Sequence, residues 1–390
     1  MPAERPGPGA EQARLAIRAL TLTAFRNYPR LRLAVDGRPV VLTGPNGAGK
    51  TNLLEAVSYL GAGRGLRSAR LGDVDCWTDD ADAQPQPWAV AAVLDAPGGS
   101  FEVGTGRDGA AATARRLVRI DGKPQSGPAA LASRVPILWL TPSQDRLFID
   151  SPSGRRRFLD KLVAVGDPAH AGRINEYERA LRERARLLKT PVTDPAWLTA
   201  LERTMAETGI AVAAARLIAV ADLTRAAAGG IGPFPAAVVV ADGEAEAWLG
   251  QGPALDAEDR LADALAASRV RDTETGGAGH GPHRTDMSVC EADSGRAAAV
   301  LSTGEQKSLL LGIILAASRL QAERHGFAPL LLLDEVSAHL DADRRRALHG
   351  EIAALGAQAW MTGTDQALFS DLGGQARLLR VEGGSVTEAP

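Results

Sequence analysis

The feature that most constrains the fold of this chain is a glycine-rich stretch near its N-terminus, residues 44–51, with the sequence GPNGAGKT. It has the form G-x-x-x-x-G-K-[ST], follows the apolar run 40–42, and precedes a helix-like segment at 52–57. In this strand, loop and helix context, glycines let backbone N–H groups turn towards a phosphate, and the new helix offers more unpaired N–H groups and the positive end of its dipole. The stretch therefore predicts a phosphate-binding loop in an α/β protein.

The chemistry of this phosphate loop assigns roles to its polar side chains. Lys50 is predicted to reach the β- and γ-phosphate oxygens, and the Thr51 hydroxyl is predicted to ligate Mg²⁺. A solvated glycine-rich turn is the alternative, and the strand and helix on either side argue against it. The residues expected to contact the nucleotide are Gly44, Pro45, Asn46, Gly47, Ala48, Gly49, Lys50, Thr51 and Asn52.

The composition indicates a globular protein without a membrane span. The chain has 390 residues, of which 45% are hydrophobic and 23% charged, and no apolar run approaches the ~20 residues that cross a bilayer. Residues 1–14 are rich in Pro and Gly without an apolar core, so we expect a disordered leader and not a signal peptide. Cys76 and Cys290 lie far apart without metal-ligand spacing, which fits a cytoplasmic protein.

The charge distribution leaves room for a local nucleic-acid surface. The net charge of −3 argues against a uniformly basic nucleic-acid binder, but arginines cluster in places. One cluster, Arg64, Arg67 and Arg70, lies in the glycine-rich residues 61–70, which we call the arginine loop, and is our candidate for contacting DNA phosphates. A mobile solvated turn is an equally good interpretation of the same stretch.

Periodicity divides the rest of the chain into three parts. Alternating stretches at 15–22, 31–35, 88–94, 100–104 and 116–120 predict an antiparallel β layer, and 136–140 predicts a buried strand. From Ser151-Pro152 onward the pattern becomes helical, with a helix over about 174–188, another from Asp194 to about 228 that is ~50 Å long, and a last one capped by Asp256 and ending near 271. We therefore expect the N-terminal part of a phosphate-binding lobe at 15–145, an inserted helical lobe at 146–275, and the C-terminal part of the phosphate-binding lobe at 276–390.

A second apolar strand, residues 330–333, ends in Asp334 and Glu335, which we call the carboxylate pair. Asp334 is placed to hold Mg²⁺ through water, and Glu335 to orient or deprotonate the attacking water. An apolar strand ending in a solvated acidic turn is common on its own. Together with the phosphate loop, the carboxylate pair predicts the other half of a nucleotide site.

The signature stretch, residues 301–307 (LSTGEQK), precedes an apolar helical pattern. Ser302 can cap that helix with Glu305 as its reciprocal partner, so one interpretation is a well-made helix start. The same hydroxyl and exposed N–H groups can instead bind a γ-phosphate. Two phosphate-binding elements so far apart in one chain make sense if two copies face each other head to tail, each nucleotide lying between them.

Together these motifs resemble an ABC-type ATPase head of the SMC-like group. The phosphate loop, the signature stretch, the carboxylate pair and the following residues 337–341 (SAHLD) occur in that class in this order. Within the class, residues 25–28 (FRNY), 151–160 (SPSGRRRFLD), 281–286 (GPHRTD) and 362–365 (TGTD) are similar to the RecF family. The resemblance runs from about 17 to 380 and implies an ABC-type P-loop ATPase head with a mixed sheet and an antiparallel β layer, plus the inserted α-helical lobe.

The resemblance also implies site residues. They are Lys50, Glu335 and Ser302 for catalysis, Thr51, Asp334 and Gln144 for the metal, Ser302, Gly304, Glu305 and Asp341 for the dimer interface, and Arg26 as a further nucleotide contact. Transport-type members carry a switch histidine where this chain has residues 360–365 (WMTGTD), so the γ-phosphate sensor is open, with Thr364 or Asp365 as candidates. His283 and Arg284 are either structural or functional.

The function implied by the resemblance is an ATP-dependent DNA-binding protein of recombinational repair and replication. ATP and Mg²⁺ would join two copies into a homodimer on duplex DNA near single-strand gaps, and slow, DNA-stimulated ATP hydrolysis would release it. The family implies RecR, RecO and RecA as partners, a nucleoid-associated location in the cytoplasm, and no membrane. A GTPase is disfavoured because the chain has no Asn-Lys-x-Asp motif.

Two other functions stay open from the motifs alone. The ATPase subunit of a membrane transporter would share the same ATP chemistry, but the absent switch histidine and the arginine-rich insertion argue against it. A chromosome-organising SMC-like head would carry very long coiled-coil arms, whereas this insertion of about 130 residues reaches only ~50 Å.

Overall fold

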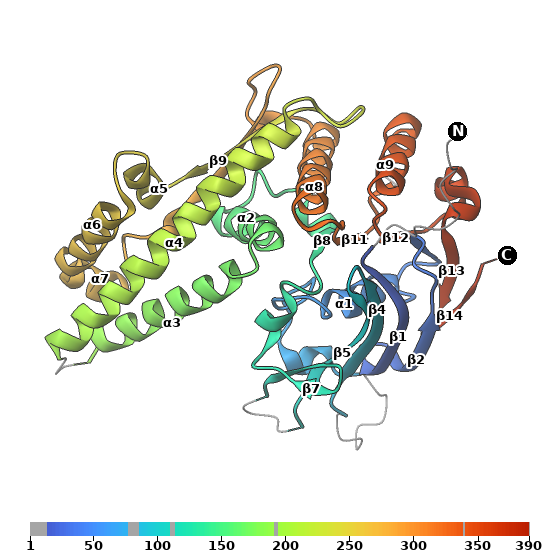
Figure 1. Cartoon of the computed structure of the whole chain (residues 1–390), viewed down its shortest axis with the longest axis horizontal. Coiled ribbons are helices and arrows are strands. Elements are labelled where there is room, and N and C mark those ends of the chain that lie inside the picture. The colour runs from blue at the N-terminus through green and yellow to red at the C-terminus, as the bar shows by residue number, and fades with distance from the viewer. Residues whose placement is uncertain (1–13, 77–85, 110–113, 191–193, 338–339, 390) are drawn as a thin grey trace, which may run out of the picture.

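Two sheets and a lobe of helices make up most of the structure (Figure 1). The computed structural model describes residues 14–76, 86–109, 114–190, 194–337 and 340–389. The predicted leader lies outside these ranges except for its last residue, Arg14. The sheets lie side by side at one end, near both chain termini, and the helical lobe projects from them (Figure 1).

A mixed sheet carries the phosphate loop, and its strands follow the order β14-β13-β3-β12-β11-β8. Neighbours are parallel except for the edge pair β13 and β14. The central strands β3, β12 and β11 are buried along their whole length because helices or the second sheet cover each side, and all four residues of β11 are leucines. The bounds are β3 (Val40–Thr43), β8 (Ile137–Leu140), β11 (Leu330–Leu333), β12 (Ala359–Gly363), β13 (Arg377–Glu382) and β14 (Ser385–Glu388).

The predicted antiparallel layer is present as a second sheet in the order β2-β1-β4-β5-β6-β7. Alternate residues of β1 and β5 point inward and pack with the apolar side chains of α1 (Lys50–Ser58) and the mixed sheet in one core. Edge-to-face contacts of Phe25 with Tyr59 and with Trp88 lie in this core. The bounds are β1 (Ala16–Phe25), β2 (Tyr28–Ala34), β4 (Ala89–Ala96), β5 (Gly99–Arg107), β6 (Arg116–Ile120) and β7 (Lys123–Pro124).

The inserted lobe is helical as predicted, with α4 (Pro195–Ala227) as its longest member at 33 residues. Its other helices are α2 (Pro152–Gly166), α3 (His170–Leu188), α5 (Glu244–Leu249), α6 (Ala254–Ala267) and α7 (Arg269–Thr275). The expected last helix capped by Asp256 is wrong in its bounds. Asp256 lies in the first turn of α6, and the chain breaks at Ser268 into α6 and α7.

The sequence prediction missed one strand inside the lobe. β9 (Ala237–Asp242) pairs antiparallel with β10 (Asp286–Glu291), which lies in the expected C-terminal part. Helices α2 and α4 also share a core with α8 (Thr303–His325) and the mixed sheet. The division of the chain at 145 and 275 therefore stays a prediction. The other helices of the described residues are α9 (Ala342–Ala354) and the 3-10 turns η1 (Leu71–Val74), η2 (Pro128–Leu131), η3 (Pro142–Gln144), η4 (Pro282–Arg284), η5 (Ala298–Val300) and η7 (Gln366–Gln375).

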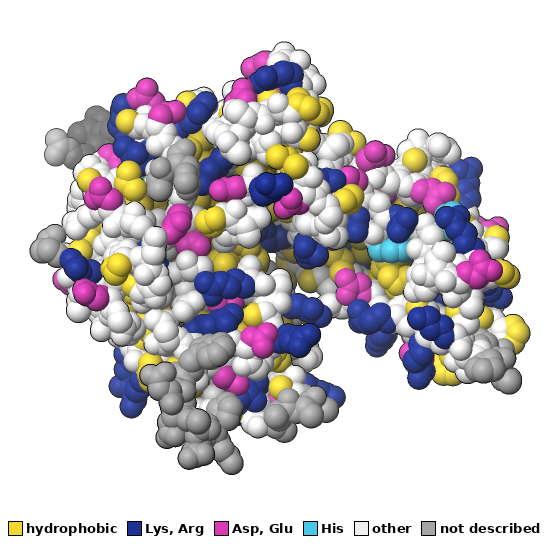
Figure 2. All heavy atoms as spheres, turned by 180° about the vertical axis from the view of Figure 1, so that it is seen from behind, with side chains coloured by type: hydrophobic (Ala, Val, Ile, Leu, Met, Phe, Trp, Pro, Cys, Tyr) yellow, Lys and Arg dark blue, Asp and Glu magenta, His cyan; other side chains and the backbone are white. Residues whose placement is uncertain are grey.

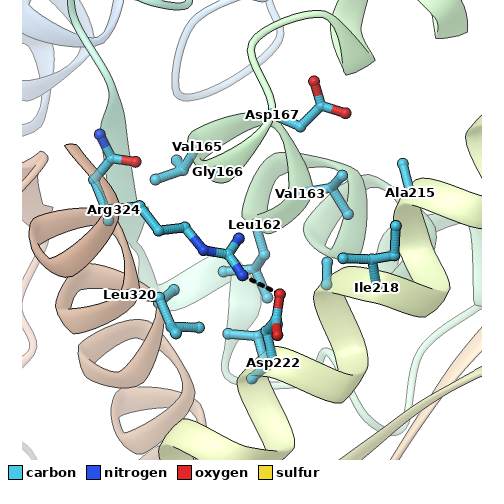
Figure 3. A pocket seen from close by; sticks show the side chains of 14 residues that line it. Leu162, Val163, Val165, Gly166, Asp167, Ala215, Ile218, Asp222, Leu320 and Arg324 are labelled. Atoms are coloured by element: carbon cyan, nitrogen blue, oxygen red, sulfur yellow. Dashed lines mark hydrogen bonds and ion pairs between the residues drawn. The ribbon is translucent and has the colours of Figure 1, made fainter.

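The joint between the lobe and the mixed sheet is built on α8. Side chains of α2, α4 and α8 surround a small, largely apolar pocket there (Figure 3). Across its mouth Arg324 of α8 forms an ion pair with Asp222 of α4. The lobe is thus attached to the ATPase part by apolar packing and by this ion pair.

A buried arginine holds the far end of the lobe together. Arg184 of α3 is 1% exposed and donates to Glu202 of α4 (3.0 Å), to Asp272 of α7 (2.8 Å) and to the Leu265 carbonyl of α6 (2.7 Å). Glu202 also accepts from Arg269, and Asp272 also accepts from Ser268 and the Gly279 N–H, but Arg184 is the buried cation that both carboxylates share.

Replacing Arg184 with Met should destabilise the lobe by about 3–5 kcal/mol, because Glu202 and Asp272 would lose their shared buried partner. Urea and thermal unfolding measure the effect. The matched control is Arg182→Met, two residues earlier on α3, where the side chain is 67% exposed and pairs with Glu178; there we expect a change within about 0.5 kcal/mol. Equal stability of the two variants would contradict a structural role for Arg184.

Candidate nucleotide-binding site

The phosphate loop joins the end of β3 to the start of α1, as its sequence predicts. Two of its glycines are sterically required. Gly44 has φ +142° and a Cβ there would lie 2.2 Å from the Val381 carbonyl oxygen, while Gly49 has φ +112° and a Cβ there would lie 2.5 Å from Asn27 Nδ2. The phosphate loop is therefore packed closely against β13 at its start and against the residues between β1 and β2 at its end.

The ammonium group of Lys50 is turned back over this loop. Its Nζ donates to the carbonyl oxygens of Gly44 (2.6 Å) and Pro45 (2.9 Å). Burial lowers the pKa of Lys50, and the nearby carboxylates of Glu335 and Asp334 oppose that shift. A desolvated cation at the mouth of the loop suits an anionic ligand.

The two predicted metal ligands meet although they are far apart in sequence. Thr51 Oγ1 donates to Asp334, with distances of 3.0 Å to Oδ1 and 3.1 Å to Oδ2. Among the described residues no group of three or more His, Cys, Asp or Glu side chains could hold a metal. One carboxylate and one hydroxyl fit Mg²⁺, which keeps several waters and takes phosphate oxygens rather than a complete protein cage.

Thr362 ties the carboxylate pair together, and the sequence prediction overlooked it. Its Oγ1 donates to Asp334 Oδ1 (2.8 Å) and accepts from the backbone N–H of Glu335 (2.8 Å). The candidates named from sequence do not make these contacts: Thr364 is exposed, and Asp365 Oδ1 accepts from the Ala367 N–H at the start of η7. The strand register, which pairs Leu333 with Met361, was the information needed to find Thr362.

Glu335 itself has an unusual backbone. Its φ is +54°, in the left-handed region that non-glycine residues adopt at a cost of about 1–3 kcal/mol. The N–H bond to Thr362 helps to hold this conformation. Such outliers concentrate where a side chain must be aimed, which is consistent with the role predicted for this carboxylate.

The signature stretch forms a capped helix start that faces solvent. Ser302 Oγ accepts from the Glu305 N–H (3.4 Å), and Glu305 Oε2 accepts from the Ser302 N–H (2.7 Å), so the capping box is present. The hydrogen bond from Ser302, with Arg296 nearby, lowers the pKa of Glu305 to about 2. Ser302 and Gly304 are exposed, so the N-terminus of α8 is accessible to an anion, although phosphate binding there stays a prediction.

Lys307 pairs the signature helix with Asp145 and was not assigned a role from the sequence. Its side chain is 5% exposed, and its Nζ lies 3.6 Å from Asp145 Oδ1. Burial lowers the pKa of Lys307, while Asp145, Glu335 and Asp334 act in the opposite direction. The only signal in the sequence was a lysine at the end of the signature stretch, just before the apolar run of the helix.

Three predicted site residues are engaged elsewhere in this structure. Gln144 Oε1 accepts from the Thr141 N–H (3.1 Å) and so caps its own turn. Arg26 makes two 2.9 Å bonds to the buried carboxylate of Glu55, so its guanidinium already has a structural partner. Asp341 caps α9 by accepting from the Arg344 N–H (2.8 Å), and its neighbours at 338–339 lie outside the described residues. Their proposed roles stay predictions.

The arginine loop lies against the phosphate loop's helix. Arg67 Nη1 donates to Asn52 Oδ1 and to Glu55 Oε2, both at 2.7 Å. Arg64 and Arg70 are exposed, and neither forms an ion pair with any residue in the described ranges. His283 is different: Tyr177 and the Ala278 carbonyl hold its two ring nitrogens, which favours a structural role.

Comparison with known proteins places this geometry in a class. Residues 16–386 match the RecF/RecN/SMC N terminal domain. The fold is similar to a solved structure described as the recombination mediator protein RecF-ATPrS in the RecFOR pathway, with a TM-score of 0.82 at 21% identity over 97% of this chain and 99% of that one. An Smc head from Pyrococcus yayanosii gives a TM-score of 0.55 at 13% identity, covering 96% of this chain and 97% of that one. The chain is therefore an ABC-type ATPase head by fold.

Its relatives define the family more closely. The chain is 46% identical over 375 residues to the DNA replication and repair protein RecF of Rhizobium rhizogenes strain K84, covering 96% of this chain and 98% of the relative. It is 48% identical over 383 residues to the protein of the same name from Caulobacter sp. strain K31, covering 95% and 97%. The chain belongs to the RecF family of DNA replication and repair proteins.

Family membership decides between the alternatives left open by the motifs, because neither the transporter subunit nor the long-armed SMC head is the family that the relatives define. In the described part of the chain, no helix combines the length and apolarity needed to cross a bilayer.

Substituting Lys50 with Ala should weaken ATP binding by roughly 10–100-fold, as expected for losing a charged hydrogen-bond donor to phosphate. Titration with a fluorescent ATP analogue measures it. Lys123→Ala on the exposed β7 turn provides the control and should bind like the parent protein. An unchanged affinity in the Lys50 variant would separate this lysine from nucleotide binding.

Proposed function

We propose that this protein is an ATP-dependent DNA-binding ATPase of recombinational repair and replication, which forms a head-to-tail dimer on ATP. The observation that carries the proposal is the meeting of Thr51 with Asp334 beside Lys50, because it joins the phosphate loop to the carboxylate pair at one edge of the sheet. Ser302, on an exposed helix start, supplies the element for a second copy.

Each residue has a part in the proposed reaction. Lys50 and the backbone N–H groups of the loop bind the phosphates, and Thr51 and Asp334 hold Mg²⁺, directly or through water. When bound, the ion neutralises charge that develops on the phosphate oxygens. Glu335 orients the attacking water and accepts its proton.

The dimer follows from the separation of functions along the chain. The side-chain partner of Ser302 within the described residues is Glu305, which leaves the remaining N–H groups of this helix start directed at solvent. A γ-phosphate bound in the loop of a second copy would bring negative charge to this positive helix end. Gly304 and Asp341 would lie at the same interface.

The DNA surface would include the arginine loop. Arg64 and Arg70 are exposed beside the nucleotide site, so a dimer formed on ATP would present both copies of this loop together. On the face seen in Figure 2, Lys and Arg side chains alternate with acidic ones and flank the hollow between the ATPase part and the lobe. Gapped duplex DNA is the proposed ligand, and family membership supports RecR, RecO and RecA as partners.

Binding to a gapped duplex should require ATP in the Glu335→Gln protein, which is expected to bind ATP but hydrolyse it ~10²–10⁴-fold more slowly. Affinity would be measured at one fixed moderate salt concentration with ATP, with ADP and without nucleotide, because salt sets electrostatic affinity.

A protein that combines Arg64→Ala and Arg70→Ala should bind DNA more weakly in the same titration, and its affinity should depend less steeply on salt. Arg182→Ala on the lobe is the control. Equal DNA affinity with ATP, with ADP and without nucleotide would contradict the proposal that an ATP-induced dimer binds DNA.

Ser302→Arg should prevent ATP-dependent dimers while leaving ATP binding by the monomer intact, because the long side chain would fill the space of the partner's γ-phosphate. Analytical ultracentrifugation with ATP measures the dimer. Ser302→Ala is the control for the lost cap, worth about 0.5–2 kcal/mol of helix stability. A Ser302→Arg protein that still dimerises with ATP would refute the proposed head-to-tail dimer.

A further inference from the structure

Thr362 contacts the carboxylate pair, but the motifs of the phosphate loop and the carboxylate pair assign it no role. It is the second-last residue of β12 and is 1% exposed, and β12 lies between the strands that carry the two halves of the site. β12 is hydrogen-bonded to β3 on one side and to β11 on the other. Any side chain at this position can therefore act on both halves.

The hydroxyl of Thr362 acts in both directions at once. A hydroxyl has one proton to give and lone pairs to accept with. Since Asp334 is an acceptor and the Glu335 N–H is a donor, the proton goes to Asp334 Oδ1 and a lone pair receives the N–H. The same oxygen fixes the side chain of one catalytic carboxylate and the backbone of the other.

Asp334 is held from two sides as a result. Thr51 donates to it from the phosphate loop, and Thr362 donates to Oδ1 from β12. A carboxylate with two hydroxyl donors has little freedom to rotate, so its direction is set before a ligand arrives.

Glu335 depends on the same hydroxyl for its backbone. Its φ of +54° is kept while its N–H is bonded to Thr362. Loss of the acceptor would leave this N–H unpaired beside buried residues and would favour relaxation towards an ordinary φ. That rotation would move the Glu335 carboxylate away from its present direction.

We propose that Thr362 is a positioning residue for ATP hydrolysis, which sets Asp334 and Glu335 relative to each other through one shared hydroxyl. The proposal rests on the ATPase function proposed above. In this proposal the side chain on β12 that contacts the carboxylate pair is Thr362, and not the exposed Thr364 or the helix-capping Asp365. Thr362 does not need to touch the nucleotide to have this effect.

The test compares Thr362→Val, which keeps the shape and removes the hydroxyl, with Thr362→Ser, which keeps the hydroxyl. The Val variant should lose at least ~tenfold in kcat for ATP hydrolysis, with ATP affinity changed by less than ~threefold. The Ser variant should hydrolyse ATP within ~threefold of the parent. Thr362→Ala serves as a second hydroxyl-free variant where Val does not fold.

A matched control comes from the other sheet. Thr105 is also buried, and its Oγ1 also both donates, to the Leu117 carbonyl, and accepts, from Arg116 Nε. Thr105→Val should lower thermal stability about as much as Thr362→Val and leave kcat unchanged. If kcat fell only because stability was lost, it would fall in both variants. If Thr362 positions the carboxylates, kcat should fall only in Thr362→Val.

A double-mutant cycle with Glu335→Gln completes the test. If Thr362 acts through Glu335, then Thr362→Val should slow hydrolysis much less in the Glu335→Gln background than in the parent. Equal turnover in Thr362→Val and parent, no rescue by Ser, or full additivity with Glu335→Gln would each overturn the inference while leaving the proposed function intact. Parent turnover that does not depend on Glu335 would remove the proposed function, and this inference with it.

Discussion

The site depends on one contact, the hydrogen bond between Thr51 and Asp334, which joins residues separated by 283 positions in sequence. It forms because β3 and β11 are parallel and flank the same strand, β12, so their carboxyl ends reach one edge of the sheet. The all-apolar strands fix this order by burial on both faces. The phosphate loop, the proposed metal ligands and Glu335 all lie at this edge.

Helix α8 extends the influence of that edge to the rest of the molecule. It begins at the exposed signature stretch, packs against α2 and α4, and leads through residues 326–329 into β11 and the carboxylate pair. Lys307, one turn into this helix, places its buried charge near Asp145, Glu335 and Asp334. The surface expected to meet a second copy and the carboxylate pair are therefore joined by one continuous stretch of chain, α8 followed by β11.

Much of this arrangement could be predicted because the signals are local. The phosphate loop, the apolar strand before Asp334 and the Ser302 cap are each written in a few adjacent residues. Thr362, the strand β9 and the break at Ser268 could not be found in this way. Thr362 matters because of its register opposite β11, and β9 is stable because it pairs with β10 some 50 residues later. Such long-range pairings leave little trace in local periodicity.

Counting arginines predicts a DNA surface less well than asking which of them have no buried partner. Arg184 and Arg216 are almost fully buried and neutralise carboxylates of the lobe, and Arg155 is paired with Asp286. These side chains cannot reach phosphate without leaving an unpaired carboxylate behind. Arg67 is intermediate, since it shares Glu55 with Arg26 and can turn outward while Glu55 keeps one partner. The proposed DNA surface therefore draws on the arginines that folding does not use, and Arg64 and Arg70 beside the nucleotide site are among them.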